Sequence, residues 1–301
     1  MLSAEAKREL ERRFAERTEQ EPPLAERRRT WEAEALLDRL PDGAHFSAVI
    51  AGGVASEWME VPDVDDARVF LLLHGGGYNA GSPKTHRKLA AHLSQATNMR
   101  VLVPDYRLAP EHPFPAGVKD ALLAYGWLLS EGRRADDIIV GGDSAGGGLA
   151  LSMLLALREA GGAMPRAAVL MAPWTDLSCS GESYETLRER DPIITRENLL
   201  QAAGWYAAHR DLADPMASPL FADLSGLPPM LIHAGGDEVM VDDSRMFAER
   251  ASAAGVSVTC KIFPGLWHVF HTATPDVPES AQAIEEIGAF VRDQFEGAQI
   301  D

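Results

Sequence analysis

The stretch Ile138–Leu157, IIVGGDSAGGGLALSMLLAL, surrounds Ser144 with five glycines and places them between two apolar runs. The first run has the pattern of a buried strand, and the second has that of a helix. A serine at such a turn must adopt a strained backbone, so its neighbours have to be small. The glycines therefore predict a nucleophile elbow, a strand-to-helix turn that holds the Ser144 hydroxyl above a sheet at the positive end of a helix.

Two other interpretations of this stretch stay open. Ser144 could simply cap the helix, with the glycines needed only for close packing. The stretch also begins like a phosphate loop, because Gly141 and Gly146 have the GxxxxG spacing. Gly147 and Gly148, however, stand where a phosphate loop requires lysine and serine or threonine, which disfavours a nucleotide site.

Strand-like and helix-like segments alternate over most of the chain. The run RVFLLL at residues 68–73 looks like a strand buried on both faces, and helical patterns separate it from later apolar runs. This alternation is typical of βαβ units. It predicts an α/β fold with a mostly parallel, doubly wound sheet and helices on both faces, formed by residues 1–301 as a single domain.

One segment interrupts the alternation. From Trp174 the chain shows helical patterns but no convincing strand until PMLIHAG at residues 229–235. Ligands bind at the carboxyl ends of the strands in an open α/β sheet, so an insertion after such an end is a candidate lid. We expect residues of about 175–215 to form it.

A serine nucleophile needs a base and an acidic residue that orients the base. In this fold they follow the serine in the order Asp or Glu, then His. Asp237 directly follows the apolar strand MLIHAGG, and His268 lies in the loop PGLWH after the strand-like residues 257–263. Both therefore fall at carboxyl ends of strands, as Ser144 does. Asp237 has the alternative role of a turn or cap residue, and His271 is the competing base.

The segment His74–Gly81, HGGGYNAG, follows the predicted strand at residues 68–73. Its glycine N–H groups are not obstructed by side chains, so those of Gly76 and Gly77 can donate to an oxyanion together with the N–H of Ala145. The sequence therefore predicts an oxyanion hole at this loop.

The same segment partly matches a dinucleotide fingerprint. Gly75, Gly77 and Ala80 satisfy GxGxxA, and Asp105 ends the next predicted strand. The preceding His74, the long spacing to Asp105 and the complete serine elbow further on all disfavour this alternative. We expect His74 to brace the loop by hydrogen bonds.

The composition limits the partners and the compartment. The chain has 28 Lys and Arg residues against 45 Asp and Glu residues, a formal net charge of −17. This charge disfavours nucleic acids and anionic membranes and favours neutral or cationic small molecules. Cys179 and Cys260 are too few for a disulfide framework, and neither a signal-peptide pattern nor a membrane-spanning run is visible. We expect a cytoplasmic protein.

The remaining histidines show neither HExxH nor spaced Cys and His clusters, so no metal site is predicted. His86 and His112 look like ordinary turn or helix-surface residues.

Five ordered motifs carry a resemblance to a known family: HGGGYNAGS, DYRLAPEHPFPAG, GDSAGGGLA, LPPMLIHAGGDEVMVDDS and PGLWHVFH. In this order they resemble the bacterial hormone-sensitive-lipase-type carboxylesterases of the α/β-hydrolase fold, from about residue 70 to the end. The resemblance implies Ser144 as nucleophile, Asp237 and His268 as its partners, and Gly76, Gly77 and Ala145 as oxyanion donors.

The resemblance also implies a helical cap, built from residues 1–43 and about 175–215 over an acyl pocket, and a homodimer through the edge strand at residues 257–263. Two positions depart from the family pattern. Gly148 stands where Asn is common, and Trp267 is bulky beside the base, where it could narrow the pocket or pack under the lid.

The expected activity is hydrolysis of short- to medium-chain acyl esters through an acyl-enzyme, with His268 as the base and no cofactor. Two alternatives stay open: hydrolysis of lactones or amides by the same residues, and ligand binding without catalysis. Some relatives in this family, such as the plant gibberellin receptor, bind a ligand after losing the catalytic histidine. The presence of His268 disfavours that role here.

Overall fold

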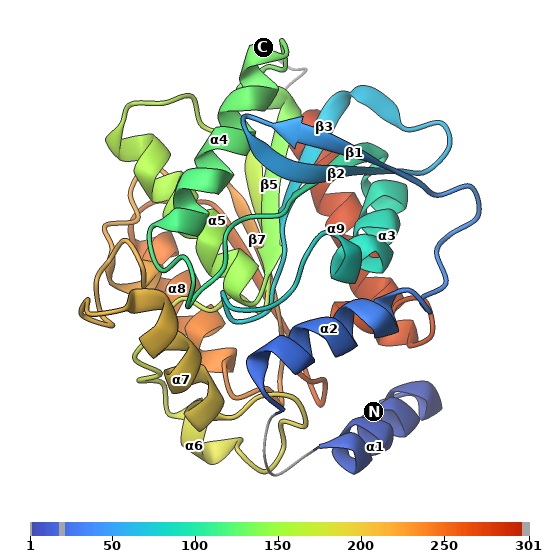
Figure 1. Ribbon diagram of the computed structural model, residues 1–301, viewed down its shortest axis with the longest axis vertical. Coiled ribbons are helices and arrows are strands. Elements are labelled where there is room, and N and C mark those ends of the chain that lie inside the picture. The colour runs from blue at the N-terminus through green and yellow to red at the C-terminus, as the bar shows by residue number, and fades with distance from the viewer. Residues whose placement is uncertain (1, 18–21, 297–301) are drawn as a thin grey trace.

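The computed structural model describes residues 2–17 and 22–296 and has an open β-sheet at its centre (Figure 1). The described strands lie in the order β1-β2-β4-β3-β5-β6-β7-β8. Strand β2 is antiparallel to both of its neighbours, and the pairs from β4 to β8 are parallel, so the predicted mostly parallel sheet is confirmed. The strands are β1 His45–Ala51, β2 Val54–Glu60, β3 Asp65–Leu73, β4 Met99–Pro104, β5 Ile138–Asp143, β6 Ala167–Met171, β7 Met230–Gly235 and β8 Val258–Phe263.

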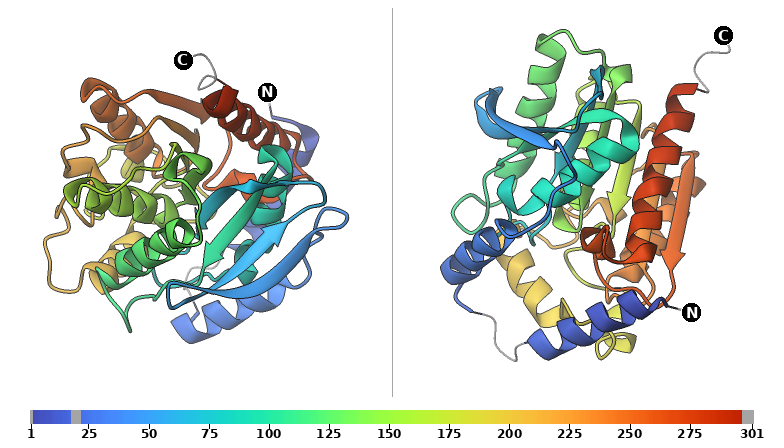
Figure 2. Two further views of the ribbon diagram at one scale, coloured as in Figure 1. Left: turned by 90° about the horizontal axis from the view of Figure 1, so that it is seen from above. Right: turned by 90° about the vertical axis from the view of Figure 1, so that its right-hand side faces the viewer.

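Helices cover both faces of the sheet, which explains why β5, β6 and β7 are mostly apolar and are buried along their whole length. Helices α3 (Arg87–Thr97) and α9 (Pro278–Glu296) pack together on one face (Figure 2). Helices α4 (Ala116–Ser130), α5 (Ala145–Glu159) and α8 (Val241–Ala253) cover the other. The carboxyl ends of the parallel strands therefore meet at one edge, where α/β sheets bind ligands.

Further helices lie beyond this edge, as the right-hand view of Figure 2 shows. They come from the two segments that were expected to form a cap, and residues 1, 18–21 and 297–301 lie outside the described part of the chain. Among residues 2–17 and 22–296, no helix is both long and apolar enough to cross a bilayer. These helices are α1 Ala4–Glu16, α2 Leu24–Ala35, α6 Ser183–Thr186 and α7 Arg196–Ala207. The described residues also form the short 3-10 helices η1 Lys84–His86, η2 Ala135–Asp137, η3 Pro219–Phe221 and η4 Phe270–Ala273.

One arginine anchors α2 to the layer below it. Arg28 donates to the carbonyl oxygens of Asn79 (2.7 Å) and Ala109 (2.9 Å) and pairs with the Glu111 carboxylate (2.8 Å). Because Asn79 belongs to the glycine-rich loop after β3, these contacts fix α2 directly on that loop.

Trp267 packs beneath α1. Its side chain is fully buried in a cluster with Ala6 and Phe270. The guanidinium of Arg13 on α1 lies 5.2 Å from the centre of the indole ring. Of the two roles considered for Trp267, packing under the helical layer is therefore the one that the structure shows.

Candidate active site

Ser144 lies at the sharp turn between β5 and α5. Its backbone angles, φ 53° and ψ −122°, fall in a region that residues with side chains rarely adopt. A Cβ on Gly142 would collide with the Gly146 backbone, and a Cβ on Gly146 would collide with the carbonyl oxygen of Leu73. The Ser144 N–H donates to the carbonyl of Met171 at the end of β6 (2.9 Å), which fixes the turn further. Small neighbours are therefore a steric requirement of this turn.

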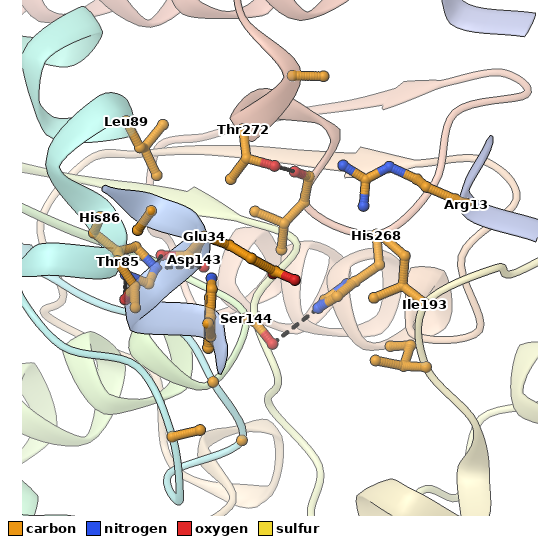
Figure 3. Close-up of a pocket in the computed structure, with 18 of the residues that line it drawn as sticks. Arg13, Glu34, Thr85, His86, Leu89, Asp143, Ser144, Ile193, His268 and Thr272 are labelled. Atoms are coloured by element: carbon orange, nitrogen blue, oxygen red, sulfur yellow. Dashed lines mark hydrogen bonds and ion pairs between the residues drawn. The ribbon is translucent and has the colours of Figure 1, made fainter. Parts of the chain in front are cut away.

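His268 faces Ser144 from the loop between β8 and η4. Its Nε2 lies 2.9 Å from the Oγ of Ser144 (Figure 3). The competing histidine, His271, lies instead against His233, with 3.5 Å between ring nitrogens, and burial lowers its pKa well below the usual value. His268 is thus the imidazole within reach of the serine proton.

The acidic partner of His268 differs from the sequence-based expectation. The Oε2 of Glu238, a fully buried residue, lies 3.3 Å from the Nδ1 of His268. The carboxylate of Asp237 instead forms an ion pair with the exposed Arg190 (2.8 Å). The assignment of Asp237 to His268 is therefore wrong.

The turn after β7 explains this difference. The N–H of Asp237 donates to the carbonyl of Leu266 (3.0 Å), which fixes the turn against the loop that carries His268. Consecutive residues of such a turn point to different sides, so Glu238 faces inward and Asp237 faces Arg190. Both residue types suit the role, and nothing in the sequence separated the two neighbours.

A second buried carboxylate, that of Asp191, stabilises the turn that carries Glu238. It was not predicted from the sequence. Asp191 accepts the N–H groups of Ile193 (2.8 Å) and Ile194 (3.1 Å) with one oxygen and that of Val239 (3.0 Å) with the other. Its bond to Val239 links the segment before α7 to the loop that carries Glu238. The only local signal was an Asp-Pro pair, which is common in turns.

The carboxylates of Glu238 and Asp191 change the pKa of His268. Burial alone would lower the pKa of His268, but the hydrogen bond and charge of Glu238, with the charge of Asp191, raise it above its usual value. Burial raises the pKa of Glu238, and the contact with His268 opposes that change. The protonated form of His268 is thus stabilised in the site.

The glycine-rich loop after β3 lies beside the serine. Gly76 and Gly77 adopt positive φ angles of 118° and 62°, which favour glycine. Both residues line the same cavity as Ser144. Among the described residues, the backbone N–H groups of Gly76, Gly77 and Ala145 donate to no protein acceptor. Ala145 begins α5, where N–H groups have no partner within the helix.

His74 braces this loop. Its ring stacks on Tyr106 with 4.1 Å between centroids, and its Nδ1 lies 2.9 Å from the carbonyl oxygen of Gly75. The Tyr106 hydroxyl donates to the carbonyl of His74 (2.6 Å). Burial lowers the pKa of His74 to about 3, so the ring is neutral at physiological pH.

His86 is not the surface residue that the sequence suggested. It is buried at the end of η1, and its Nε2 lies 3.2 Å from the Oδ1 of Asp143, the residue before the nucleophile. This contact could not be predicted from the sequence, because the partners are 57 residues apart.

A cavity of about 640 Å³ extends above Ser144 and His268. In Figure 3, Glu34 and Arg13 reach into it from α2 and α1, Leu89 and Thr272 lie along its upper side, and Ile193 lies beside His268. Within the described part of the chain, no group of three or more His, Cys, Asp or Glu side chains is placed to hold a metal ion. Ser144 and His268 are therefore both part of the cavity wall.

The parallel sheet, the strained serine turn at the end of β5 and the histidine after β8 together define the class of this protein as an α/β-hydrolase. A family model described as alpha/beta hydrolase fold matches residues 70–272, and the chain belongs to that family.

Similar proteins of known activity or structure identify a narrower class within the α/β-hydrolases. An acetyl-hydrolase of Streptomyces hygroscopicus is 44% identical over 244 residues, which cover 81% of each chain. The crystal structure of an esterase from the bacterial hormone-sensitive lipase family is 41% identical, with a TM-score of 0.94 over 98% of this chain and 99% of the other. The crystal structure of EstE5 soaked by p-nitrophenyl butyrate is 39% identical, with a TM-score of 0.94 and the same coverage. The protein is a carboxylic ester hydrolase of the hormone-sensitive-lipase type, which confirms the resemblance.

Proposed function

We propose that the protein hydrolyses short- to medium-chain acyl esters through an acyl-enzyme on Ser144. The observation that carries the proposal is the 2.9 Å contact between the Oγ of Ser144 and the Nε2 of His268. His268 takes the serine proton, and the alkoxide attacks the ester carbonyl. His268 then protonates the leaving alcohol and activates the water that releases the acid.

Glu238 orients the base in this mechanism. Its contact with Nδ1 keeps the proton of the neutral ring on that nitrogen, so that Nε2 is free to accept the proton of Ser144. Glu238 also stabilises the imidazolium that forms at each proton transfer. Asp237 takes no part, because its carboxylate pairs with Arg190.

The oxyanion is held by backbone N–H groups of Gly76, Gly77 and Ala145. Loss of one such donor typically costs about 3 kcal/mol, or a hundredfold or more in rate. The open N–H groups described above and the positive φ angles of both glycines support this role.

The helices beyond the sheet edge act as a cap over the acyl pocket. Residues of α2 and α7 line the cavity above Ser144, and its volume of about 640 Å³ is in the usual range of small-molecule sites. EstE5 was soaked by p-nitrophenyl butyrate, so a four-carbon acyl ester is a suitable first substrate to test.

A panel of p-nitrophenyl esters from acetate to palmitate tests the proposal on the wild type and on Ser144→Ala. We expect the highest kcat/KM at short to medium chains and no activity above background in the variant. Unchanged activity in Ser144→Ala would refute the mechanism, and a maximum at palmitate would refute the substrate class.

The proposal includes a cytoplasmic homodimer that pairs through β8. This strand is last in the sheet order, and residues along it are exposed, including Cys260. The free thiols Cys179 and Cys260 suit a reducing compartment. Light scattering should give twice the 32.6 kDa chain mass at micromolar concentration. A monomer under these conditions would contradict the pairing.

A further inference from the structure

Asp143 ties the serine turn to the glycine-rich loop. Its Oδ1 accepts the N–H of Gly75 (3.0 Å) and lies 3.2 Å from the Nε2 of His86. Asp143 and His86 are only 4% and 2% exposed. A Cβ on Gly75 would collide with the Asp143 carboxylate, so the loop approaches as closely as a glycine allows. The buried carboxylate of Asp143 therefore contacts the loop directly, and Asp143 is bonded in the chain to the nucleophile Ser144.

Both ring nitrogens of His86 have partners. The Nε2 lies 3.2 Å from the Oδ1 of Asp143 and 3.2 Å from the backbone nitrogen of Gly75, and the Nδ1 lies 2.8 Å from the Oγ1 of Thr85. The Thr85 hydroxyl in turn donates to the carbonyl of Ser82 (2.9 Å) and accepts its N–H (2.9 Å). The ring of His86 is therefore held on one side by Thr85 and on the other by Asp143 and Gly75.

The contact with His86 favours the carboxylate form of Asp143. Burial alone would raise the pKa of Asp143, but the electrostatic interaction and hydrogen bond with His86, together with His74 and the N–H of Gly75, outweigh burial and lower it. A buried carboxylate without such a partner is costly and tends to move or to take up a proton. Without His86, the contact between Asp143 and Gly75 would therefore weaken.

Helix α2 also lies against the cluster of Thr85, His86 and Asp143. The ring of Trp31 on α2 lies 5.7 Å from that of His86, and its Cζ3 would be 3.0 Å from a Cβ placed on Gly76. Figure 3 shows Thr85, His86 and Asp143 together on the wall beside Ser144. The loop is thus held from below by Asp143 and from above by α2.

We infer that His86 is a positioning residue for ester hydrolysis: it holds the Asp143 carboxylate, which fixes Gly75 and thereby the N–H groups of Gly76 and Gly77 relative to Ser144. The inference rests on the proposed function and adds a residue that touches neither substrate nor nucleophile. Because the oxyanion forms only in the transition state, misplaced donors lower kcat rather than substrate affinity.

Two variants test the hydrogen bonds of His86. His86→Leu removes both ring nitrogens, and His86→Gln keeps an N–H donor. With p-nitrophenyl butyrate, we expect His86→Leu to lower kcat by about tenfold or more while KM changes by less than about threefold. His86→Gln should recover part of the loss. His92→Leu, on α3 and outside the cluster, serves as the matched control and should leave kcat unchanged.

A transition-state analogue distinguishes positioning from a structural role. A trifluoromethyl ketone forms a tetrahedral adduct on a serine, and its affinity should fall in His86→Leu by the same factor as kcat/KM. Thermal unfolding and active-site titration correct each value for the folded fraction. A corrected kcat within twofold of the wild type, or an unchanged affinity for the analogue, would overturn the inference.

The experiments distinguish a failure of this inference from a failure of the proposed function. Activity remaining in Ser144→Ala would overturn the mechanism itself. An inactive Ser144→Ala beside a fully active His86→Leu would overturn only the role of His86.

Discussion

The carboxylate that faces the imidazole of His268 belongs to Glu238, whose Oε2 lies 3.3 Å from Nδ1. The preceding residue, Asp237, lies 2.8 Å from the exposed Arg190. Two adjacent acidic residues thus have different neighbours, one buried against the base and the other in an ion pair that solvent reaches. Such ion pairs contribute little to stability.

Substitution of these two residues should have very different effects. Glu238→Gln should lower kcat by about 10³- to 10⁴-fold, because the amide no longer stabilises the imidazolium or fixes its tautomer. Asp237→Asn should stay within about threefold of the wild type. Steady-state hydrolysis of p-nitrophenyl butyrate measures both, with thermal unfolding to verify folding. A larger loss in Asp237→Asn would return the acid role to that residue.

The pH profile should report the environment of His268. The base must be neutral to accept the serine proton, so kcat/KM falls as the pH drops below the pKa of His268. Glu238 and Asp191 raise that pKa, so the acidic limb should lie above the usual value of about 6.5. Asp191→Asn removes one of the two charges and should move this limb to lower pH. A limb at or below 6.5 in the wild type, or no movement in the variant, would contradict the assignment.

The nucleophile turn could be predicted because its cause is local. A serine with positive φ between strand and helix needs small residues within two positions, and Gly142 and Gly146 are visible in the sequence itself. The alternation of strands and helices likewise reveals the sheet, and the sheet brings the ends of β5, β7 and β8 together.

Contacts between distant residues could not be predicted in this way. Asp191 meets Val239 across 48 positions, and His86 meets Asp143 across 57. Each pairing depends on how a loop packs after the sheet has formed, and neither Asp191 nor His86 belongs to one of the five motifs. The choice between Asp237 and Glu238 failed for a related reason, since the direction of a turn residue is set by tertiary contacts.

Gly148 should tolerate no side chain, although the family pattern commonly has Asn there. A Cβ on Gly148 would collide with the carbonyl oxygen of Trp174 and the hydroxyl of Tyr78. Gly148→Ala should therefore lower the free energy of unfolding by about 1–3 kcal/mol, and Tyr78→Phe should restore part of it. Gly126→Ala on α4 is the control, because nothing lies within 4 Å of its Cβ position. Urea unfolding measures both, and equal stability of the two alanine variants would contradict the steric argument.

His233 should make the fold less stable in mild acid. Burial, only partly opposed by Glu286, lowers its pKa to about 4, and Lys261 adds to the effect. Its folded pKa is below the unfolded value, so this contribution is present at neutral pH and is lost as the pH falls below about 6.5. At pH 5 the loss amounts to about 2 kcal/mol.

His233→Gln should therefore lose about 2 kcal/mol less than the wild type between pH 7 and pH 5 in urea unfolding. The comparison between variants removes the contributions of other titrating groups, such as Asp243, whose raised pKa of about 7 acts in the opposite direction. The same pH dependence in both proteins would show that His233 does not set it.

Arg28 should matter for substrate binding, because it fixes α2 over the cavity. Its guanidinium bonds to the carbonyl oxygens of Asn79 and Ala109 and pairs with Glu111. Arg28→Ala loses these charge-assisted bonds, worth about 1–2 kcal/mol, and should raise KM for p-nitrophenyl butyrate by up to about tenfold while kcat changes less. Arg8→Ala on α1, where a 67% exposed side chain pairs with Glu5 of the same helix, should leave KM unchanged. An unchanged KM in Arg28→Ala would contradict this role of Arg28. It would show that the remaining contacts of α2 with the loop after β3 are enough to hold the helix in place.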